Sequence, residues 1–235
     1  LYITHEDHPD NIKDKLYRSV LLCTREQRME MTGTAEGIKR LLSAEKVLQR
    51  RFTYLPMNRP GLTVEEVYAT VQIANDKRKA ETGKGYDLII DDYPAKLTTE
   101  RASKGNLQRR HIDEIIYGSY FTGMALDLNV HVLTAIQTNR EGAKTNKQRG
   151  AGGRRLLAME DVQESYGAMQ TASNVISLNR DDQAEQNNRL TYHLCKTRSN
   201  NGNWSVVTKT RYDLCLLHGL DLDTVYYRGT ATLDD

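Results

Sequence analysis

Polar side chains follow three short apolar runs of the sequence, at the point where each run ends. These side chains are Glu6, the adjacent acids Asp91 and Asp92, and Gln137. A short apolar run bounded by polar turns is typical of a buried strand in a parallel sheet. The carboxyl ends of parallel strands share one edge of the sheet, where α/β proteins bind their ligands. The sequence therefore predicts one site that is built from all three strand ends.

The residue types suit three different tasks at such a site. Glu6 is a candidate general base for activating water. Asp92 or Asp91 is a candidate holder of magnesium, directly or through a water, because Mg²⁺ prefers oxygen ligands. Gln137 carries an amide that can sense a phosphate or a water by hydrogen bonding. For the two acids the alternative is an ordinary acidic turn after a strand, and the stretch 86–97 alone does not decide between them.

Strand and helix patterns alternate through the first part of the chain, and strands follow one another in the last part. Helices are expected at 10–21, 35–50, 63–83 and 107–128, and strands at 1–4, 50–57, 88–90, 130–140, 173–181, 189–198 and 203–213. Thr63 and Glu66 have the spacing of a helix-capping box, and Gly83 marks the end of that helix. This order predicts an α/β fold, in which flanking helices cover a mostly parallel sheet that ends in an antiparallel hairpin.

Composition indicates an ordinary globular protein of the cytoplasm. A chain of 235 residues is long enough for one large domain, and we expect a single domain over 1–235. The net charge is only +2, and the three cysteines are an odd number at scattered spacings, which argues against a disulfide framework. No apolar run has the length of a membrane span, and no signal segment opens the sequence.

Two glycine-containing stretches carry clustered cations. The stretch 138–155 contains one acid, Glu141, and the cations Arg140, Lys144, Lys147, Arg149, Arg154 and Arg155. The stretch 98–110 adds Arg101 and Lys104, followed by Arg109 and Arg110. Such loops can follow the phosphate backbone of single-stranded DNA without recognising its sequence. The alternative is that they are simply solvated loops.

Five pieces of the sequence, in this order, resemble one known family. The pieces are LYITHED, LIIDDYPAKL, LNVHVLTAIQTNREG, MEDVQESYGAMQTASNVISLNRD and LCKTRSNNGNW. Together they resemble the RecA-like motor domain of DnaB-type hexameric replicative helicases, in particular those of bacteriophages. The resemblance runs from residue 1 to about 213. It implies an ATPase that binds ATP and Mg²⁺ between the subunits of a homo-hexameric ring and moves along single-stranded DNA. It also suggests a primase and a helicase loader as partners.

The resemblance also implies roles for individual residues. Glu6 corresponds to the catalytic base, Gln137 to the sensor, and Asp92 to the Walker B acid that holds Mg²⁺, with Asp91 as its alternative. Arg180 falls at the end of a strand near the nucleotide. Lys196 and Arg198 would act in trans on the nucleotide of the neighbouring subunit, where a guanidinium stabilises charge on the transferring phosphoryl group. The alternative for Lys196 and Arg198 is an ordinary solvated strand end.

One expected motif does not occur in the sequence. A nucleotide motor needs G-x-x-x-x-G-K-[ST] to cradle the phosphates, and TGKGYD at 82–87 has the lysine without the leading glycine or a following Ser or Thr. In the family that loop lies one strand and one helix before the position of Leu1. We therefore expect the first strand and helix of the fold to be missing, the parent protein to extend upstream, and these residues alone not to hydrolyse ATP.

Three other functions remain open at this point. His5, Glu6, Asp7 and His8 suggest the ligands of a metal-dependent nuclease, although neighbouring residues on a strand end point in opposite directions and rarely converge on one ion. A recombinase-type or clock-type ATPase that forms filaments or rings on DNA has a similar order of strands. A catalytically inactive module that binds nucleic acid through the same basic loops is the third.

Overall fold

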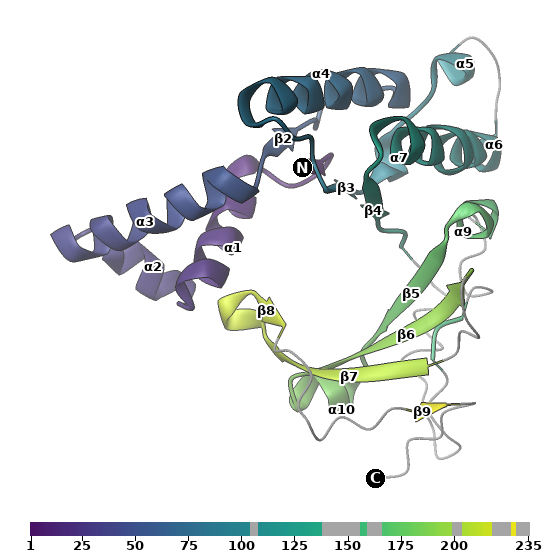
Figure 1. The fold of residues 1–235 in the computed structure, drawn as a ribbon. Helices are drawn as coiled ribbons and strands as arrows, with labels where there is room; N and C mark the ends of the chain where they lie inside the picture. The colour runs from purple at the N-terminus through teal and green to yellow at the C-terminus, as the bar shows by residue number, and fades with distance from the viewer. Residues whose placement is uncertain (104–107, 138–155, 159–165, 199–203, 218–226, 229–235) are drawn as a thin grey trace. The chain divides into compact units, whose positions relative to one another are not determined.

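The structure is a computed structural model that describes residues 1–103, 108–137, 156–158, 166–198, 204–217 and 227–228 (Figure 1). Contacts between residues divide the chain into two compact units. The first unit contains Leu1–Leu21 and Arg25–Ile136, and the second contains Leu22–Thr24 and Gln137–Asp235. The single domain expected over 1–235 stays a prediction. No helix within the described residues is both long and apolar enough to cross a bilayer.

A parallel sheet forms the centre of the first unit. Its strands are β1 (Tyr2–Thr4), β2 (Tyr54–Pro56), β3 (Leu88–Asp92) and β4 (His131–Thr134). They pair in the order β2-β1-β3-β4, and every pair is parallel. The predicted parallel α/β sheet is thus confirmed, although β4 is shorter than the strand expected at 130–140.

Helices of the first unit follow the predicted order, with a few short additions. They are α1 (Pro9–Leu21), α2 (Arg25–Met31), α3 (Ala35–Arg51), α4 (Val64–Thr82), the 3-10 turn η1 (Pro94–Lys96), α5 (Glu100–Ser103), α6 (Arg109–Asp113), the π-helix η2 (Glu114–Phe121) and α7 (Thr122–Leu128). The additions, which the sequence patterns did not predict, are α2 and the short elements η1 and α5. The helix expected at 107–128 is continuous in sequence but widens into π geometry in its middle.

The core of the first unit lies between the sheet and the helices α4, η2 and α7, which Figure 1 shows on one side of it. Ile3 of β1 and Ile89 of β3 are almost fully buried, as are Val67 of α4, Ile116 of η2 and Met124 of α7. Ile3 pairs with Asp91 in the sheet register, so this helix-covered face is also the face toward which Asp91 points.

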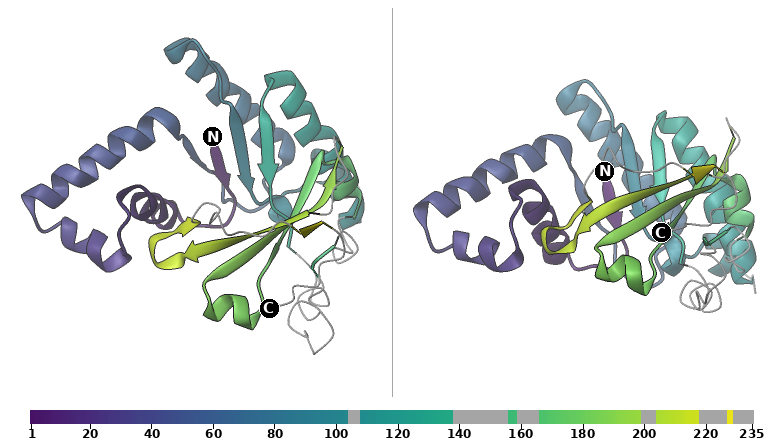
Figure 2. Two further views of the ribbon diagram at one scale, coloured as in Figure 1. Left: turned by 60° about the horizontal axis from the view of Figure 1, so that its bottom comes forward. Right: turned by 90° about the horizontal axis from the view of Figure 1, so that it is seen from below.

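An antiparallel sheet is the main feature of the described part of the second unit. Its strands are β5 (Asn174–Asn179), β6 (Arg189–Thr197), β7 (Trp204–Arg211), β8 (Leu216–Leu217) and β9 (Tyr227–Arg228). β5, β6, β7 and β8 pair in sequence order, and β9 pairs with β7 (Figure 2). The short helices are α9 (Tyr166–Thr171), α10 (Asp182–Gln186) and the 3-10 turn η4 (Tyr212–Leu214). The antiparallel part is therefore larger than the hairpin that the sequence predicted.

Candidate active site

The ends of β1 and β3 bring two of the predicted site residues to one edge of the sheet. β1 and β3 are neighbouring parallel strands, so their carboxyl ends lie at the same edge. Asp92 is the last residue of β3, and Glu6 follows the end of β1 at Thr4. Glu6 and Asp92 therefore share the edge at which α/β folds bind ligands.

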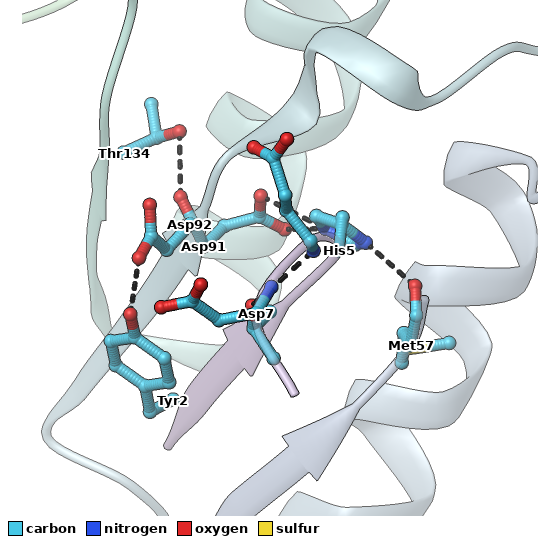
Figure 3. A network of polar contacts seen from close by, with 9 residues as sticks. Tyr2, His5, Asp7, Met57, Asp91, Asp92 and Thr134 are labelled. Atoms are coloured by element: carbon cyan, nitrogen blue, oxygen red, sulfur yellow. Dashed lines mark hydrogen bonds and ion pairs between the residues drawn. The ribbon is translucent and has the colours of Figure 1, made fainter. Parts of the chain in front are cut away.

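Asp91 and Asp92 are not equivalent, because successive side chains of a strand point to opposite faces of the sheet. Asp92 pairs with Thr4 and shares the face of Tyr2, whereas Asp91 shares the face of Ile3. Figure 3 shows the two carboxylates turned apart, Asp92 toward Tyr2 and Asp91 toward His5. Asp91 is only 1% exposed, while Asp92 is half-buried. Of the two acids, Asp92 is thus the one that a ligand from solvent can reach.

The hydroxyl of Tyr2 donates a hydrogen bond to Oδ2 of Asp92. The Tyr2 ring stacks on Phe52 and Tyr54, with ring centroids 5.8 and 6.2 Å apart, so it has a fixed orientation. Burial, and then the hydrogen bond to Asp92, raise the pKa of Tyr2 well above its usual value. The phenol is therefore protonated at neutral pH and holds one oxygen of Asp92 in place.

Asp91 forms a buried pair with the imidazole of His5, which is 4% exposed. Nε2 of His5 lies 3.1 Å from Oδ1 and 3.2 Å from Oδ2 of Asp91. Burial alone would lower the pKa of His5, but the hydrogen bond and charge of Asp91, together with the Met57 hydrogen bond and the charge of Asp92, raise that pKa. Burial raises the pKa of Asp91, against the lowering effect of His5. Both changes favour a proton held between the two side chains.

Glu6 is exposed at the turn that follows β1. The backbone N–H groups of Glu6 and Asp7 donate to Oγ1 of Thr4, at 3.4 and 3.2 Å, which fixes the start of this turn. Nζ of Lys96 lies 3.1 Å from Oε1 of Glu6. A cavity of about 430 Å³ lies beside this pair, and it is lined by His5, Glu6, Met57, Asn58, Arg59, Pro60, Leu62, Lys96 and Leu97.

The residues around Asp92 fit a magnesium ion that is shared with a ligand rather than a metal held by protein alone. Within the described part of the chain, no cluster of three or more His, Cys, Asp or Glu residues is arranged to hold a metal. Mg²⁺ is commonly bound through one or two carboxylates, waters and substrate phosphates, and the half-buried carboxylate of Asp92 suits that role. His5 is not available as a metal ligand, since both ring nitrogens have partners.

Gln137 follows the end of β4 and is exposed, but its contacts place it in the second unit. β4 lies next to β3, as the predicted shared edge requires. At this edge Thr134 of β4 also contacts β3, because its hydroxyl donates to the backbone oxygen of Asp91 at 2.9 Å. The sensor role of Gln137 stays a prediction.

Lys196 and Arg198 both bind the carboxyl-terminal end of α9. Nζ of Lys196 donates to the backbone oxygens of Met169 and Gln170, and a guanidinium N–H of Arg198 donates to that of Thr171 at 2.7 Å. Cations are favourable at this end of a helix, where carbonyl groups lack helical partners. The two predicted trans residues thus act as caps within their own chain.

Of the other predicted binding residues, the structure describes Arg180 and Arg101. Arg180 lies over the ring of Tyr212, 4.5 Å from its centroid, and pairs with Glu185 at 3.0 Å. Arg101 is exposed on α5. The remaining DNA-binding candidates lie outside the described residues: Lys104, Arg140, Lys144, Lys147, Arg149, Arg154 and Arg155.

Sequence reasoning missed the residues that support the site. Tyr2, His5, Thr134 and Lys96 each contact a predicted site residue. Tyr2 and His5 do lie in the same stretch as Glu6, but the sequence suggested His5 only as a metal ligand. Their partners are about ninety residues away along the chain, so no local pattern could reveal these contacts.

No protein-family model matches the sequence, and a search of curated proteins found no significant match. Solved structures do match. One is described as an ATPase domain and aligns with a TM-score of 0.74 and 17% identity over 94% of this chain and 74% of that one. Another shows a DnaB-like replicative helicase and its interactions with primase, with a TM-score of 0.73 and 17% identity over 94% of this chain and 50% of that one.

The chain has the fold of a DnaB-like helicase ATPase domain. The predicted RecA-like fold is thereby confirmed. The chain spans half the length of the DnaB-like helicase, so it corresponds to a part of that protein.

Proposed function

We propose that this chain is the motor part of an ATP-dependent replicative DNA helicase of a phage or bacterial replisome, working in the cytoplasm. In this proposal it moves along single-stranded DNA as a hexameric ring, with ATP bound between neighbouring subunits. The observation that carries the proposal is the helicase-type fold with Glu6 and Asp92 at one edge of its parallel sheet. A primase and a helicase loader are the proposed protein partners.

Each predicted site residue has a task in the proposed reaction. Glu6 accepts a proton from the water that attacks the γ-phosphoryl group. Asp92, held by Tyr2, would bind Mg²⁺, which neutralises negative charge on the phosphates when it is bound. Gln137 positions the water or the phosphate by hydrogen bonding. Lys196 and Arg198 of a neighbouring subunit stabilise the charge of the transition state.

The phosphate-binding loop is a separate part of the proposal. The 235 residues contain no G-x-x-x-x-G-K-[ST]. We therefore propose that the 235 residues alone do not hydrolyse ATP. DNA binding is proposed to be electrostatic, through Arg101, Lys104 and the basic residues of 138–155.

The test is ATP hydrolysis by the complete gene product that carries these residues, with and without single-stranded DNA. We expect DNA to stimulate turnover, and Glu6→Gln to reduce kcat by about 10²- to 10⁴-fold, the usual contribution of a general base. Glu81→Gln is the matched control, because Glu81 is exposed at the end of α4 and has only a 3.9 Å contact with Lys77. It should leave turnover unchanged.

Other outcomes would identify the competing functions. Single-stranded DNA binding without ATP hydrolysis would indicate an inactive binding module. DNA-stimulated hydrolysis with open filaments in electron micrographs, instead of closed rings, would indicate a recombinase-type ATPase. Equal activity of Glu6→Gln and the wild type would remove Glu6 from the mechanism.

A further inference from the structure

The imidazole of His5 connects the carboxyl ends of β1, β2 and β3, next to Glu6 of the candidate active site. Nδ1 of His5 lies 3.0 Å from the backbone oxygen of Met57, which follows β2. Nε2 binds Asp91 in β3, and His5 itself follows β1 (Figure 3). Because a carbonyl oxygen only accepts hydrogen bonds, Nδ1 must carry a hydrogen. Both nitrogens of His5 are thus committed to neighbouring strands.

Backbone hydrogen bonds join the same three strand ends as these side-chain contacts. The N–H of Met57 donates to the oxygen of Thr4 at 2.9 Å, and the N–H of His5 donates to the oxygen of Asp92 at 3.1 Å. His5 therefore lies where the chain leaves the regular sheet, at the last position that the neighbouring strands still hold. The next residue along is Glu6, which begins the turn that the Thr4 hydroxyl caps.

Stability alone does not account for this pair. Replacing a buried ion pair by apolar side chains of similar volume is often neutral or even stabilising. An apolar pair would fill the same space but would not fix directions, whereas hydrogen bonds to Asp91 and Met57 hold the ring in one orientation. The direction of the chain at this point determines where Glu6 and Asp92 point, since they directly follow His5 and Asp91 in sequence.

We propose that His5 is a positioning residue, which orients Glu6 and Asp92 by bridging Asp91 and the carbonyl of Met57. The inference rests on the proposed function for the roles of Glu6 and Asp92. The imidazole is only 4% exposed and both of its nitrogens are bonded to the protein, so His5 acts through its neighbours. A displacement of about 1 Å in a reacting group can cost on the order of 100-fold in rate, so loss of the bridge should lower kcat strongly.

The first test compares the kinetics of His5 variants of the complete gene product. The double variant His5→Leu/Asp91→Leu leaves no unpaired charge, and we expect it to keep the urea midpoint of the wild type. Its kcat should fall about 10- to 100-fold with a smaller change in KM for ATP, because misplaced side chains of Glu6 and Asp92 lose more in the transition state than in nucleotide binding. His5→Gln retains a donor to Asp91 and should recover part of the lost kcat.

Tyr17→Phe is the matched control. The hydroxyl of Tyr17 donates to Glu45, which links α1 to α3 in the same unit but away from the strand ends. This variant removes a polar link and should leave kcat unchanged. A wild-type kcat in His5→Leu/Asp91→Leu, or an equal loss in Tyr17→Phe, would overturn the proposal.

The second test does not depend on activity. Residual dipolar couplings of the backbone N–H groups of Glu6 and Tyr93 in the 235-residue chain report the orientation of the chain after His5 and Asp91. We expect these couplings to change in His5→Leu/Asp91→Leu and to keep their wild-type values in Tyr17→Phe. If the double variant does not fold, His5→Gln and His5→Asn each remove one arm of the bridge and take its place. Absence of ATP hydrolysis in the wild type would refute the proposed function, whereas unchanged dipolar couplings at Glu6 and Tyr93 would refute the positioning role.

Discussion

Two neighbouring acids at the end of one strand have different environments, and therefore different chemistry. Asp92 is half-buried and accepts a hydrogen bond from Tyr2, while Asp91 is buried and paired with His5. The alternation of side chains along β3 is the physical cause, since it places Asp91 on the helix-covered face. The sequence predicts an acidic strand end. Only the environment of each carboxylate shows which acid can bind a metal and which acid has a structural role.

The two acids should respond differently to the same substitution. Asp92→Asn removes the accessible carboxylate, and we expect ATP turnover of the complete gene product to fall about 100-fold or more, the scale of losing one transition-state electrostatic contact. Asp91→Asn keeps an oxygen that accepts from His5, so turnover should fall little. It should instead lower the free energy of unfolding by ~1–3 kcal/mol, because a charge-assisted buried hydrogen bond is weakened.

Steady-state kinetics and urea denaturation of both variants measure these two effects separately. A larger loss of turnover in Asp91→Asn than in Asp92→Asn would assign the magnesium site to the other acid. It would also contradict the argument that the more exposed of the two acids, Asp92, is the one that binds the metal.

At the scale of single elements, the helix α4 is the one whose limits follow most directly from local sequence. Thr63 and Glu66 form the predicted capping box, with Glu66 N–H donating to Thr63 Oγ1 at 3.3 Å and Thr63 N–H to Glu66 Oε2 at 3.0 Å. The helix ends at Gly83, which has a φ of 77°. All of these contacts join residues that are close together in sequence, so the local residue pattern is enough to predict both ends of the helix.

Removal of the cap leads to a prediction for α4. Thr63→Ala leaves the N–H of Glu66 without its acceptor, and should lower the free energy of unfolding by about 1 kcal/mol. Thr63→Ser keeps the hydroxyl and is the matched control, with an expected change of about a few tenths of a kcal/mol at most. Urea denaturation followed by circular dichroism measures both. A similar loss in the two variants would show that the methyl group of Thr63, and not its hydroxyl, stabilises the helix.

Elements that depend on distant contacts were predicted less well. The strands were located by their apolar runs, but no local pattern indicated that β5 joins β6 and β7 in a larger antiparallel sheet. Helix periodicity located the segment 107–128 but not the π geometry of η2, because the same apolar positions are compatible with both. The His5–Asp91 pair was missed for a similar reason, since its partners come from separate strands.

At the scale of the whole molecule, the proposed ring raises the question of which residues of one chain complete the site of another. Lys196 and Arg198 hold the carboxyl-terminal end of α9 in their own subunit. The proposed ring requires the same two side chains to reach a neighbouring nucleotide. Interfaces of rings are heterologous. In the proposed ring, one subunit would contribute Glu6 and the next would contribute Arg198 to each site.

Mixing two inactive variants of the complete gene product tests this arrangement. Glu6→Gln lacks the base, and Arg198→Gln lacks the trans charge but keeps an N–H donor for the oxygen of Thr171. Each variant alone should be nearly inactive. In rings assembled randomly from equal amounts, about one site in four combines an intact Glu6 with an intact Arg198 from its neighbour. The mixture should therefore recover up to about a quarter of wild-type ATP turnover, which is measured after the subunits are unfolded, mixed and refolded together. If Arg198 acted within its own subunit, every chain would carry one defect and mixing would restore nothing.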